Sequence, residues 1–282
     1  MTPAANGRVA FLGPEGTFTE EALLANLPGE GLTPFPYASI RDVMAAVRAG
    51  EASVVVVPIE NSIEGSVALT LDALAWDFED LVITREVVHP IRHQLIARAP
   101  RALETVTKVI SHPHAYAQCR SFLREHLPGV EHEAANSTAE AVRMVSRVDR
   151  PWVAIGNRLA AEMYECEVLR DDIEDFPDNR TRFVYLATAP AAQDLAAPYK
   201  TSLVCGIDQD EPGSLLLILS EFAYRHVNLN KVESRPSKQA LGHYIFFMDM
   251  DGKTGDTQLA QAVTCLTCKL PWLRVLGSYP VT

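Results

Sequence analysis

Apolar and polar residues alternate along the first two thirds of the chain in blocks that predict strands followed by helices. Short apolar runs at 9–12 and 54–57 predict buried strands, and the second run is four valines ended by Pro58. A continuous apolar run is typical of a strand that is covered on both faces. Between the runs, Ser39 and Asp42 have the spacing of a capping box that begins a helix. Repeated units of this kind predict an α/β fold with a mostly parallel sheet.

A second set of strand and helix patterns begins near residue 81. The β-rich stretch 81–97 is broken by Pro90, so it predicts either two strands or one strand that bends between two lobes. Periodicity and capping residues predict further elements downstream. They are strands at 106–110, 152–155 and 183–187, and helices at 114–127, from Ser137 onwards and at 157–164.

The last third of the chain has a different organisation. Residues 189–198 contain two prolines and no amphipathic period, which predicts a linker. The pattern after it predicts the order βαββαβ, which is the ferredoxin-like unit. Its elements are expected at 201–207, 213–225, 228–233, 243–250, 257–268 and 273–279. We therefore expect a two-lobed region at 1–190 and a smaller domain at 200–282.

Composition and charge exclude several classes of protein. The 282 residues are 48% hydrophobic and 22% charged, as is usual for globular proteins. The net charge is −11 and no basic stripe is visible, so neither nucleic acid nor an anionic membrane is an expected partner. An anionic small molecule remains possible, because a few local donors can outweigh a distant net charge.

Cysteine usage and the first residues point to a soluble cytoplasmic protein. The five cysteines are odd in number and irregularly spaced, which does not fit a disulfide scaffold. The start of the chain lacks the apolar stretch of a signal peptide, and no run is long enough for a membrane helix. Cys265 and Cys268 have no second pair, so we assign them to a buried helix face and expect no metal.

Three junctions between a predicted strand and a helix carry the candidate chemistry. They lie at 13–18, 58–66 and 111–115, and the helix after the first is expected to be capped by Thr17 or Thr19. Free N–H groups at helix N-termini favour anions, and ligands of open α/β sheets sit at the carboxyl ends of strands. The same residues are also typical of ordinary turns and caps.

Helix N-termini alone would not hold a small dianion. Each contributes about 0.3–1 kcal/mol, whereas even millimolar binding requires about 4 kcal/mol. A cationic fork is therefore expected as well, and Arg180 and Arg182 offer one just before the strand predicted at 183–187. The alternative is that both arginines are solvated charges at a strand edge.

Together these segments resemble the prephenate dehydratase family, and the resemblance covers nearly the whole chain. The motifs that carry it are VAFLGPEGTF at 9–18, VPIENS at 57–62 with Gly65, SHP at 111–113 and TRF at 181–183. In the last segment, PGSL at 212–215 and ESRP at 233–236 resemble the family's ACT regulatory domain, which binds phenylalanine.

The resemblance implies two α/β lobes similar to periplasmic binding proteins, with the active site in the cleft between them. It implies the conversion of prephenate to phenylpyruvate without a metal or organic cofactor, in a homo-oligomer that is a dimer or a tetramer. Thr181 would be the catalytic residue, as a hydrogen-bond donor to the leaving oxygen, and Arg182 would hold a carboxylate. The other substrate-binding residues would be Asn61, Ser62, Thr17, Ser111, His114, Asn157 and Phe183. The effector-binding residues would be Gly213, Ser214, Leu215, Asn230, Glu233, Ser234, Arg235 and Pro236.

Two positions depart from the family pattern and keep alternatives open. His114 stands where relatives often have glutamine, and Asn157 where they often have serine. Imidazole can also donate a hydrogen bond, but it titrates near neutrality, which could make activity depend on pH. One alternative is a related decarboxylase that does not aromatise its product, and another is arogenate as the substrate. An alternative of another class is a non-catalytic sensor that binds phenylalanine and turns over nothing.

Overall fold

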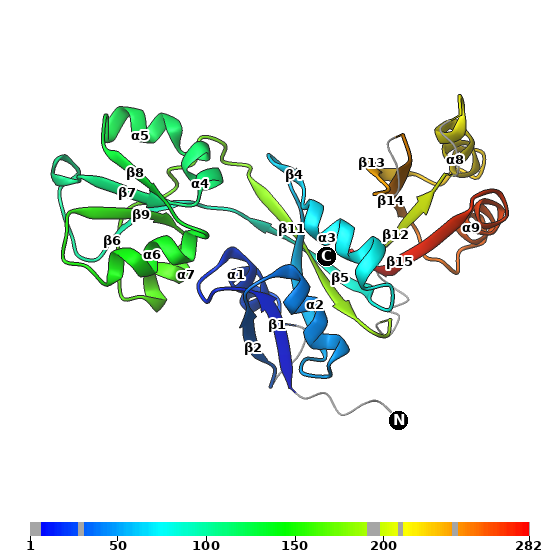
Figure 1. Ribbon diagram of the computed structural model, residues 1–282, viewed down its shortest axis with the longest axis horizontal. Coiled ribbons are helices and arrows are strands. Elements are labelled where there is room, and N and C mark those ends of the chain that lie inside the picture. The colour runs from blue at the N-terminus through cyan, green and yellow to red at the C-terminus, as the bar shows by residue number, and fades with distance from the viewer. Residues whose placement is uncertain (1–6, 28–30, 191–197, 208–210, 239–241, 282) are drawn as a thin grey trace. The chain divides into compact units, whose positions relative to one another are not determined.

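The computed structural model describes residues 7–27, 31–190, 198–207, 211–238 and 242–281 (Figure 1). The chain divides into two compact units, which are described one by one. Unit 1 comprises Met1–Thr70 and Val88–Phe183, and unit 2 comprises Leu71–Val87 and Val184–Thr282.

The first sheet has the strand order β2-β1-β3-β11-β5, with the short β4 attached to β3. Its strands are β1 (Arg8–Leu12), β2 (Thr33–Tyr37), β3 (Val54–Asn61), β4 (Gly65–Ser66), β5 (Val82–Pro90) and β11 (Arg180–Ala187). The helices between them are α1 (Phe18–Ala25), α2 (Ile40–Arg48) and α3 (Ala68–Asp72), with a π-helix at Ala73–Asp77. β1 pairs in parallel with β2 and β3, and Val55, Val56 and Val57 are fully buried. The valine run is therefore a covered strand, as predicted.

β3 does not end at Pro58, contrary to the sequence prediction. It continues to Asn61, because its pairing with β1 stops at Val56, before the proline is reached. A proline lacks only the N–H, so it is tolerated where no ladder partner needs that donor. The extension carries Asn61 to the end of the strand, where the candidate site lies.

The second sheet lies in unit 1 and has the order β10-β6-β9-β7-β8. Its strands are β6 (Gln94–Ala97), β7 (Lys108–Ser111), β8 (Glu131–Ala134), β9 (Trp152–Gly156) and β10 (Glu167–Arg170). β7 pairs in parallel with β8 and β9, while β6 runs antiparallel to β9 and β10. The sheet is thus mixed, whereas the sequence predicts one that is mostly parallel.

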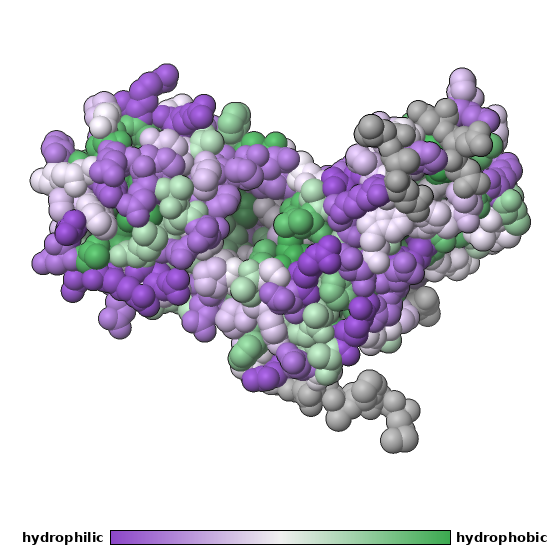
Figure 2. Space-filling model, viewed as in Figure 1, coloured by the Kyte–Doolittle hydropathy of each residue, from purple (hydrophilic) through white to green (hydrophobic). Residues whose placement is uncertain are grey.

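Helices cover both faces of this second sheet. They are α4 (Pro113–Gln118), α5 (Arg120–His126), α6 (Thr138–Ser146) and α7 (Arg158–Met163). Alternate strand residues supply the two cores, since Leu95 packs with Cys119 and Leu123, whereas Ile96 packs with Val142 and Ala160. Hydrophilic residues predominate on the face of this lobe drawn in Figure 2.

The helix predicted at 114–127 is two helices, α4 and α5, that meet at Cys119. The 173–175 segment competes for the helix backbone at this point. Gln118 O accepts a hydrogen bond from Asp175 N at 2.6 Å, and the Asp175 carboxylate accepts one from Ser121 N at 3.0 Å. These bonds end α4 and position Gln118.

Two other element boundaries matter for the site. The stretch 81–97 forms two strands, β5 and β6, with the break just after Pro90. β11 begins at Arg180, three residues earlier than predicted, because Ser62 N donates to Arg180 O at 2.9 Å and Arg180 N donates to Ser62 Oγ at 2.9 Å. The TRF motif therefore lies inside a strand instead of just before one.

Unit 2 contains the predicted βαββαβ domain. Its elements are β12 (Tyr199–Gly206), α8 (Ser214–Ala223), β13 (Leu229–Pro236), β14 (Tyr244–Asp251), α9 (Thr257–Lys269) and β15 (Trp272–Pro280). The strands form an antiparallel sheet in the order β13-β14-β12-β15, as in the ferredoxin-like fold. Most of the predicted linker, 191–197, lies outside the described residues, and the proposed limits at 190 and 200 stay a prediction.

The buried face of α9 is not the one predicted. Leu259, Ala262 and Leu266 form it, with the spacing of three and four residues that one helix face requires. Cys268 lies off this face and is exposed, and Cys265 is only partly buried. All five cysteines are free.

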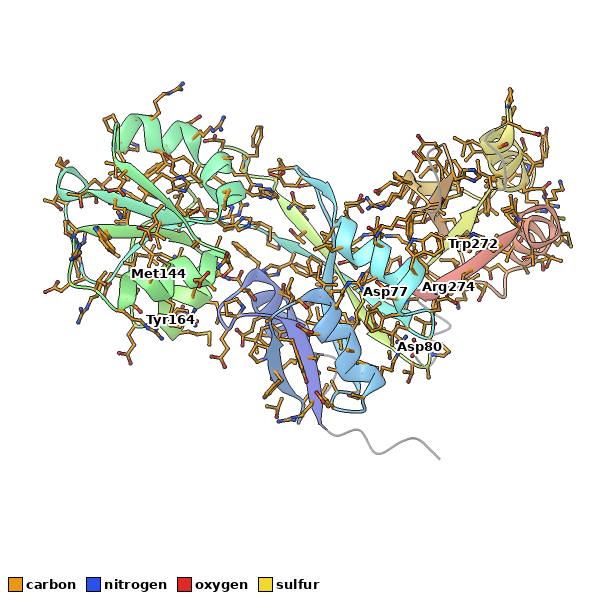
Figure 3. All side chains as sticks on the ribbon, in the orientation of Figure 1. Asp77, Asp80, Met144, Tyr164, Trp272 and Arg274 are labelled. Atoms are coloured by element: carbon orange, nitrogen blue, oxygen red, sulfur yellow. The ribbon has the colours of Figure 1, made fainter. Side chains whose placement is uncertain are left out.

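Within unit 2, β15 packs closely on the 71–87 segment. An atom added at the Cβ position of Gly277 would lie 2.2 Å from Ile83 O, so only glycine fits there. The rings of Trp76 and Trp272 are 5.4 Å apart, and the buried Arg274 guanidinium donates to Leu74 O. Figure 3 shows Trp272 and Arg274 on β15. In the described part of the chain, no helix is long and apolar enough to cross a membrane.

Candidate active site

The nine residues predicted for catalysis and substrate binding all lie in unit 1, near strand ends and helix starts. Thr17 precedes α1, Asn61 and Ser62 lie at the end of β3, Ser111 ends β7, His114 is in α4, Asn157 precedes α7, and Thr181, Arg182 and Phe183 are in β11.

The contact between Asn61 and Thr181 joins two motifs that are 120 residues apart. Asn61 Nδ2 donates to Thr181 Oγ1 at 2.9 Å, and also lies 2.8 Å from Asn179 Oδ1 and 3.2 Å from Arg180 O. Asn61 Oδ1 accepts from the backbone N–H groups of Ile63 and Glu64. Asn61 therefore holds the turn after β3 with its oxygen and β11 with its nitrogen.

The hydrogen bonds continue from Asn61 into a closed ring of four residues, which we call the amide ring: Asn61, Asn179, Gln118 and Glu64. Asn179 Nδ2 donates to Gln118 Oε1 at 2.9 Å, and Gln118 Nε2 donates to Glu64 Oε1 at 3.1 Å. The Glu64 backbone N–H then returns to Asn61 Oδ1 at 3.0 Å. Asn179 and Gln118 are buried, so the bond between them is shielded from water, whereas Asn61 is only partly buried and Glu64 is exposed.

His93 is attached to the amide ring from the side. Its Nε2 lies 3.1 Å from Gln118 Oε1, which can only accept, so Nε2 carries the proton. Burial lowers the pKa of His93 and keeps the imidazole neutral. No partner of His93 Nδ1 is found among the described residues, which agrees with an unprotonated Nδ1.

Side chains alternate along β11, and this separates the two halves of the TRF motif. Thr181 and Phe183 are buried on one face of the strand, whereas Arg180 and Arg182 point to the other. Arg182 forms an ion pair with Glu60 of β3 at 3.2 Å. The predicted cationic fork is therefore partly engaged by the protein itself, and the fully buried Phe183 belongs to the core.

The loop after β7 brings His114 next to the amide ring. His114 Nδ1 lies 3.9 Å from Glu64 Oε2, and the His112 and His114 rings meet edge to face at 5.1 Å. Burial, and secondly the neighbouring His114, lower the pKa of His112, whose Nδ1 accepts from His114 N and caps α4. Ser111 is fully buried and its hydroxyl donates to His112 O.

Thr17, and not Thr19, caps α1. Thr17 Oγ1 accepts from Glu20 N and donates to Leu12 O at 3.1 Å. The Glu20 carboxylate in turn accepts from Gly16 N. Burial raises the pKa of Glu20, although the hydrogen bond from Gly16 opposes that change. The Thr17 hydroxyl is thus used for capping.

Asn157 occupies a second polar cluster. Its Oδ1 accepts from Ala160 N and caps α7, and its Nδ2 lies 3.3 Å from Glu21 Oε2. The same carboxylate oxygen is 3.2 Å from His89 Nε2. An asparagine can cap a helix and donate at once, which a serine at this position could do only with a shorter reach.

Sequence reasoning missed six residues of these clusters: Glu21, Glu64, His89, His93, Gln118 and Asn179. Asn179 was within reach, because it directly precedes the Arg-Thr-Arg segment and a buried asparagine needs partners. Gln118 and Glu64 carry no local signal, since their roles depend on the register of distant segments. Among the described residues, no group of three or more His, Cys, Asp or Glu side chains could hold a metal ion.

Comparison with known proteins shows to which family these motifs belong. The family model for prephenate dehydratase matches residues 9–191. The chain belongs to the prephenate dehydratase family. Prephenate dehydratase of Bacillus subtilis is 38% identical to it over 96% of this chain and 98% of the relative. The enzyme of Methanocaldococcus jannaschii is 39% identical over 98% and 99%.

A solved structure extends this likeness through the last domain. The structure of a prephenate dehydratase from Arthrobacter aurescens in complex with L-Phe is 42% identical to this chain. The match covers 97% of this chain and 90% of the solved chain, and the TM-score is 0.89. The prephenate dehydratase fold therefore accounts for both lobes and for the C-terminal βαββαβ domain.

The predicted effector residues of this family member lie at two places in unit 2. Arg235, at the end of β13, donates through Nε to Asp72 Oδ1 at 3.0 Å, and Lys238 Nζ lies 2.8 Å from Asp72 Oδ2. Glu233 Oε1 is 3.8 Å from Arg235 Nη1. We call Asp72, Glu233, Arg235 and Lys238 the Asp72 cluster. Burial alone would raise the pKa of Asp72, but the hydrogen bonds from Lys238 and Arg235 hold it below its usual value.

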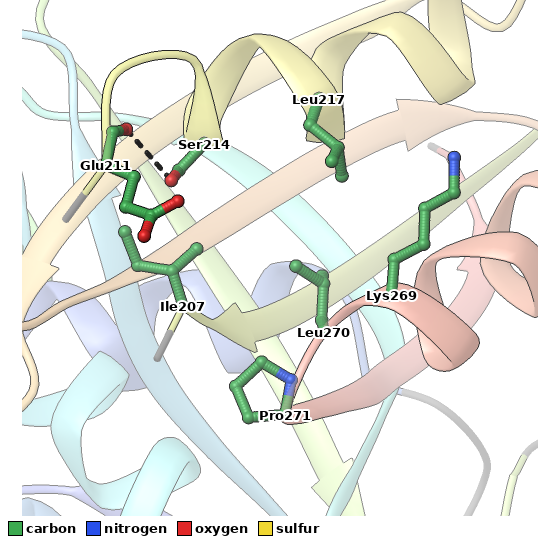
Figure 4. Close-up of a pocket in the computed structure, with 7 residues that line it drawn as sticks. All are labelled: Ile207, Glu211, Ser214, Leu217, Lys269, Leu270 and Pro271. Carbon is green, nitrogen blue, oxygen red and sulfur yellow. Dashed lines mark hydrogen bonds between the residues drawn. The ribbon is translucent and has the colours of Figure 1, made fainter. Parts of the chain in front are cut away.

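The second place is the start of α8. Gly213 precedes it in a left-handed conformation with φ of 99°, which favours glycine, and Ser214 Oγ donates to Glu211 O. Ser214 lines a pocket of about 330 Å³ with Ile207, Glu211, Leu217, Lys269, Leu270 and Pro271 (Figure 4). Leu215 is partly exposed. Asn230, on β13, donates to Asp251 at 2.7 Å and so has a partner within the fold.

Proposed function

We propose that this chain is a prephenate dehydratase that is regulated by phenylalanine. The observation that carries the proposal is the hydrogen bond between Asn61 and Thr181, which joins the ENS and TRF motifs in one polar site. It is supported by the family match and by the relatives of nearly the same length.

In this reaction the ring carboxylate leaves as carbon dioxide, and the electron pair of the broken C–C bond stays on the ring. That pair forms the new double bond of the ring as the ring C–O bond breaks, and hydroxide leaves as water once it has taken up a proton. A donor placed at the leaving oxygen typically accelerates such a step by about 10²–10⁴-fold. Thr181, a nearly buried hydroxyl held from behind by Asn61, is the donor that we propose.

The surrounding side chains are proposed to bind the two carboxylates of prephenate. Arg182 is the candidate for one carboxylate, and Asn61, Ser62, Ser111, Thr17, His114 and Asn157 are proposed to supply further contacts to the substrate. Phe183 lies in the core and is dropped from the substrate-binding set. Arg182 already pairs with Glu60, so binding of a carboxylate there would exchange one anionic partner for another. Because the proposed mechanism involves only side chains, dialysis against a chelator is expected to leave turnover unchanged.

Regulation is proposed to act through the C-terminal domain as an ACT domain. The relative from Arthrobacter aurescens was solved with L-Phe bound. A phenylalanine zwitterion needs donors for its carboxylate and acceptors for its amine, which the α8 N-terminus and the ESRP segment can supply. The proposed effector residues are Gly213, Ser214, Leu215, Asn230, Glu233, Ser234, Arg235 and Pro236. A cytoplasmic homo-oligomer, either a dimer or a tetramer, is part of the same prediction.

One assay tests the proposal and separates it from its alternatives. Purified protein is incubated with prephenate at mildly alkaline pH, where spontaneous breakdown is slow, and phenylpyruvate is followed by its enolate absorbance. We expect phenylpyruvate to form and phenylalanine to alter its rate. Consumption of prephenate without phenylpyruvate would indicate the decarboxylase, and turnover of arogenate in preference to prephenate the other substrate. No turnover, with phenylalanine still bound, would identify a sensor.

A further inference from the structure

We propose that Asn179 and Glu64 are positioning residues that fix the direction of the Thr181 hydroxyl through the amide ring. This inference rests on the proposed function and adds residues that act behind the reacting group. The ring bonds are those described above, and all of them lie within unit 1.

Each amide in the ring can be oriented in only one way. The Glu64 carboxylate accepts hydrogen bonds only, so the NH₂ of Gln118 must face it and Oε1 must face Asn179. Asn179 then presents its NH₂ to Gln118 and its oxygen to Asn61. At the other end, the backbone N–H groups of Ile63 and Glu64 require the oxygen of Asn61. The Glu64 carboxylate and the two backbone N–H groups therefore require the same direction of donation around the ring.

This fixed sense determines what the Thr181 hydroxyl can do. Asn61 Nδ2 has no lone pair to offer, so Thr181 Oγ1 accepts from it and cannot donate to it. Asn61 Nδ2 is the only hydrogen-bond partner that Thr181 Oγ1 has in the described part of the chain. The Thr181 hydrogen is thus left for a ligand. If Asn61 were turned around, its oxygen would draw that hydrogen away from the ligand.

Reversal of one member would disturb the others. Turning Asn179 would place two NH₂ groups against each other at Asn61 and two oxygens against each other at Gln118. Burial makes such contacts expensive, because water cannot satisfy the groups that are left unpaired. Consecutive bonds of the same sense also polarise one another, which favours the ring as a unit. The ring thus selects one orientation of Asn61 before substrate arrives.

The variant Asn179→Asp tests this device without changing the shape of the side chain. An ionised Asp at 179 would still accept from Asn61, but it would set a carboxylate oxygen against Gln118 Oε1. A protonated Asp could donate to Gln118, as the amide does. We therefore expect kcat at alkaline pH to fall about tenfold or more, with KM little changed, and to recover as the pH is lowered from 9 to 6.

The carboxylates near position 179 act in the same direction, whereas His93 is neutral and the Arg92 guanidinium is paired with Glu174. Glu64 and His93 face it across Gln118, while Glu174 accepts from His93 N, and Asp175 N donates to Gln118 O. The nearby carboxylates and the burial raise the pKa expected for a carboxyl introduced there. Spontaneous breakdown of prephenate at the lower pH is subtracted with a reaction that lacks protein.

Three further variants make the test decisive. Asn26→Asp makes the same change at the C-cap of α1 in the same unit, outside the ring, and is expected to keep the pH profile of the wild type. Glu64→Gln affects an exposed side chain and should fold, and it is expected to lower kcat because Gln118 can then turn. Asn179→Ala should lower kcat in the wild type but add little in a Thr181→Ala background, since Asn179 acts through Thr181.

The outcomes separate this inference from the proposed function. An inactive wild-type protein would overturn the function and the inference together. An active wild type with Asn179→Asp as active as the wild type at every pH would overturn the inference alone. An Asn179→Asp protein that does not fold moves the decision to Glu64→Gln, where an unchanged kcat would overturn the inference and a reduced kcat would support it.

Discussion

The amide ring of unit 1 and the Asp72 cluster of unit 2 both join segments that are far apart in the sequence, but with opposite chemistry. The ring links Asn61 to Asn179 and Gln118 by hydrogen bonds between neutral amides, of which Asn179 and Gln118 are buried. The Asp72 cluster links Asp72 to Arg235 and Lys238 by ion pairs, and Lys238 is exposed. Neither link is visible in the local pattern of the sequence.

The difference shows what each chemistry can supply. An amide has a donor end and an acceptor end, so a chain of amides transmits a direction. An ion pair depends little on the orientation of its groups, and at a partly exposed site it weakens as the salt concentration rises. A ring of amides suits a site where one hydrogen must point one way, whereas an ion cluster suits an attachment that has to respond to charge.

The largest effect is expected from Thr181→Val, which keeps the shape of the side chain and removes the hydroxyl. Turnover of prephenate should fall by about 10²–10⁴-fold, because the proposed donor is lost, while the fold remains. Thr84→Val is the matched control, since Thr84 is a buried threonine of the neighbouring strand β5 whose hydroxyl donates to Tyr185 O. Steady-state kinetics and thermal unfolding measure both. Near-normal kcat in Thr181→Val would remove Thr181 from the mechanism.

The next effect concerns the ligand of unit 2. Arg235→Ala should weaken phenylalanine binding by about tenfold or more, because a guanidinium is well suited to a carboxylate. Calorimetry on the whole chain measures the affinity. Lys231→Ala is the control, because it removes a positive charge from the same strand, where Lys231 pairs with Glu233. Equal affinities for Arg235→Ala and the wild type would place the effector site elsewhere.

A smaller effect is expected on stability when the Asp72 cluster loses its carboxylate. Asp72→Asn should lower the free energy of unfolding by about 1 kcal/mol at low salt, and by less at high salt. Because the pKa of Asp72 is lowered by folding, this contribution is present above about pH 4 and is lost as the pH falls through the folded-state pKa. Denaturant titration at two salt concentrations is the measurement, with Glu79→Gln as a control in the same segment. If Asp72→Asn lowered the free energy of unfolding equally at both salt concentrations, the stabilisation would not be ionic.

The smallest effect is on the pH dependence of stability, and it tests whether His93, beside the amide ring, is neutral in the folded protein. Burial lowers the pKa of His93 in the folded state. Below about pH 6.5 His93 therefore binds a proton in the unfolded state but not yet in the folded state. The wild type should therefore lose stability as the pH falls below that value. In His93→Gln, which keeps a donor for Gln118, the slope should shrink by at most about 1.4 kcal/mol per pH unit. The exposed His126→Gln should leave the slope unchanged, and an equal change in both would argue against a neutral His93.

Elements with strong local signals could be predicted from the sequence. The valine run of β3, the Ser39 cap of α2 and the βαββαβ order of the last domain all follow from periodicity and capping. The predicted element boundaries were wrong where contacts with distant segments determine where a strand or helix ends. β3 passes through Pro58 because its neighbour β1 has already ended, and the helix after Ser111 breaks at Cys119 because the 173–175 segment takes the backbone of Gln118.

The site was predictable as a set of positions, but not as an arrangement. The motifs gave Asn61 and Thr181, whereas the sequence holds no sign that Gln118 and Glu64 connect them. That connection depends on the register of β11 against the end of β3, which is fixed by the bonds between Ser62 and Arg180. For the same reason the sequence could not show that Thr181 and Arg182 face opposite sides of a strand.

The ring also bears on how this protein ages in storage. An asparagine deamidates when the backbone nitrogen of the next residue attacks its side-chain carbon, and Asn61 is followed by the small residue Ser62. In the fold, the Ser62 N–H is held by Arg180 O, and the Asn61 oxygen is held by two backbone N–H groups. The nitrogen therefore cannot approach that carbon while the chain stays folded. Shelf life is thereby tied to conformational stability, since damage at Asn61 requires the chain to open first.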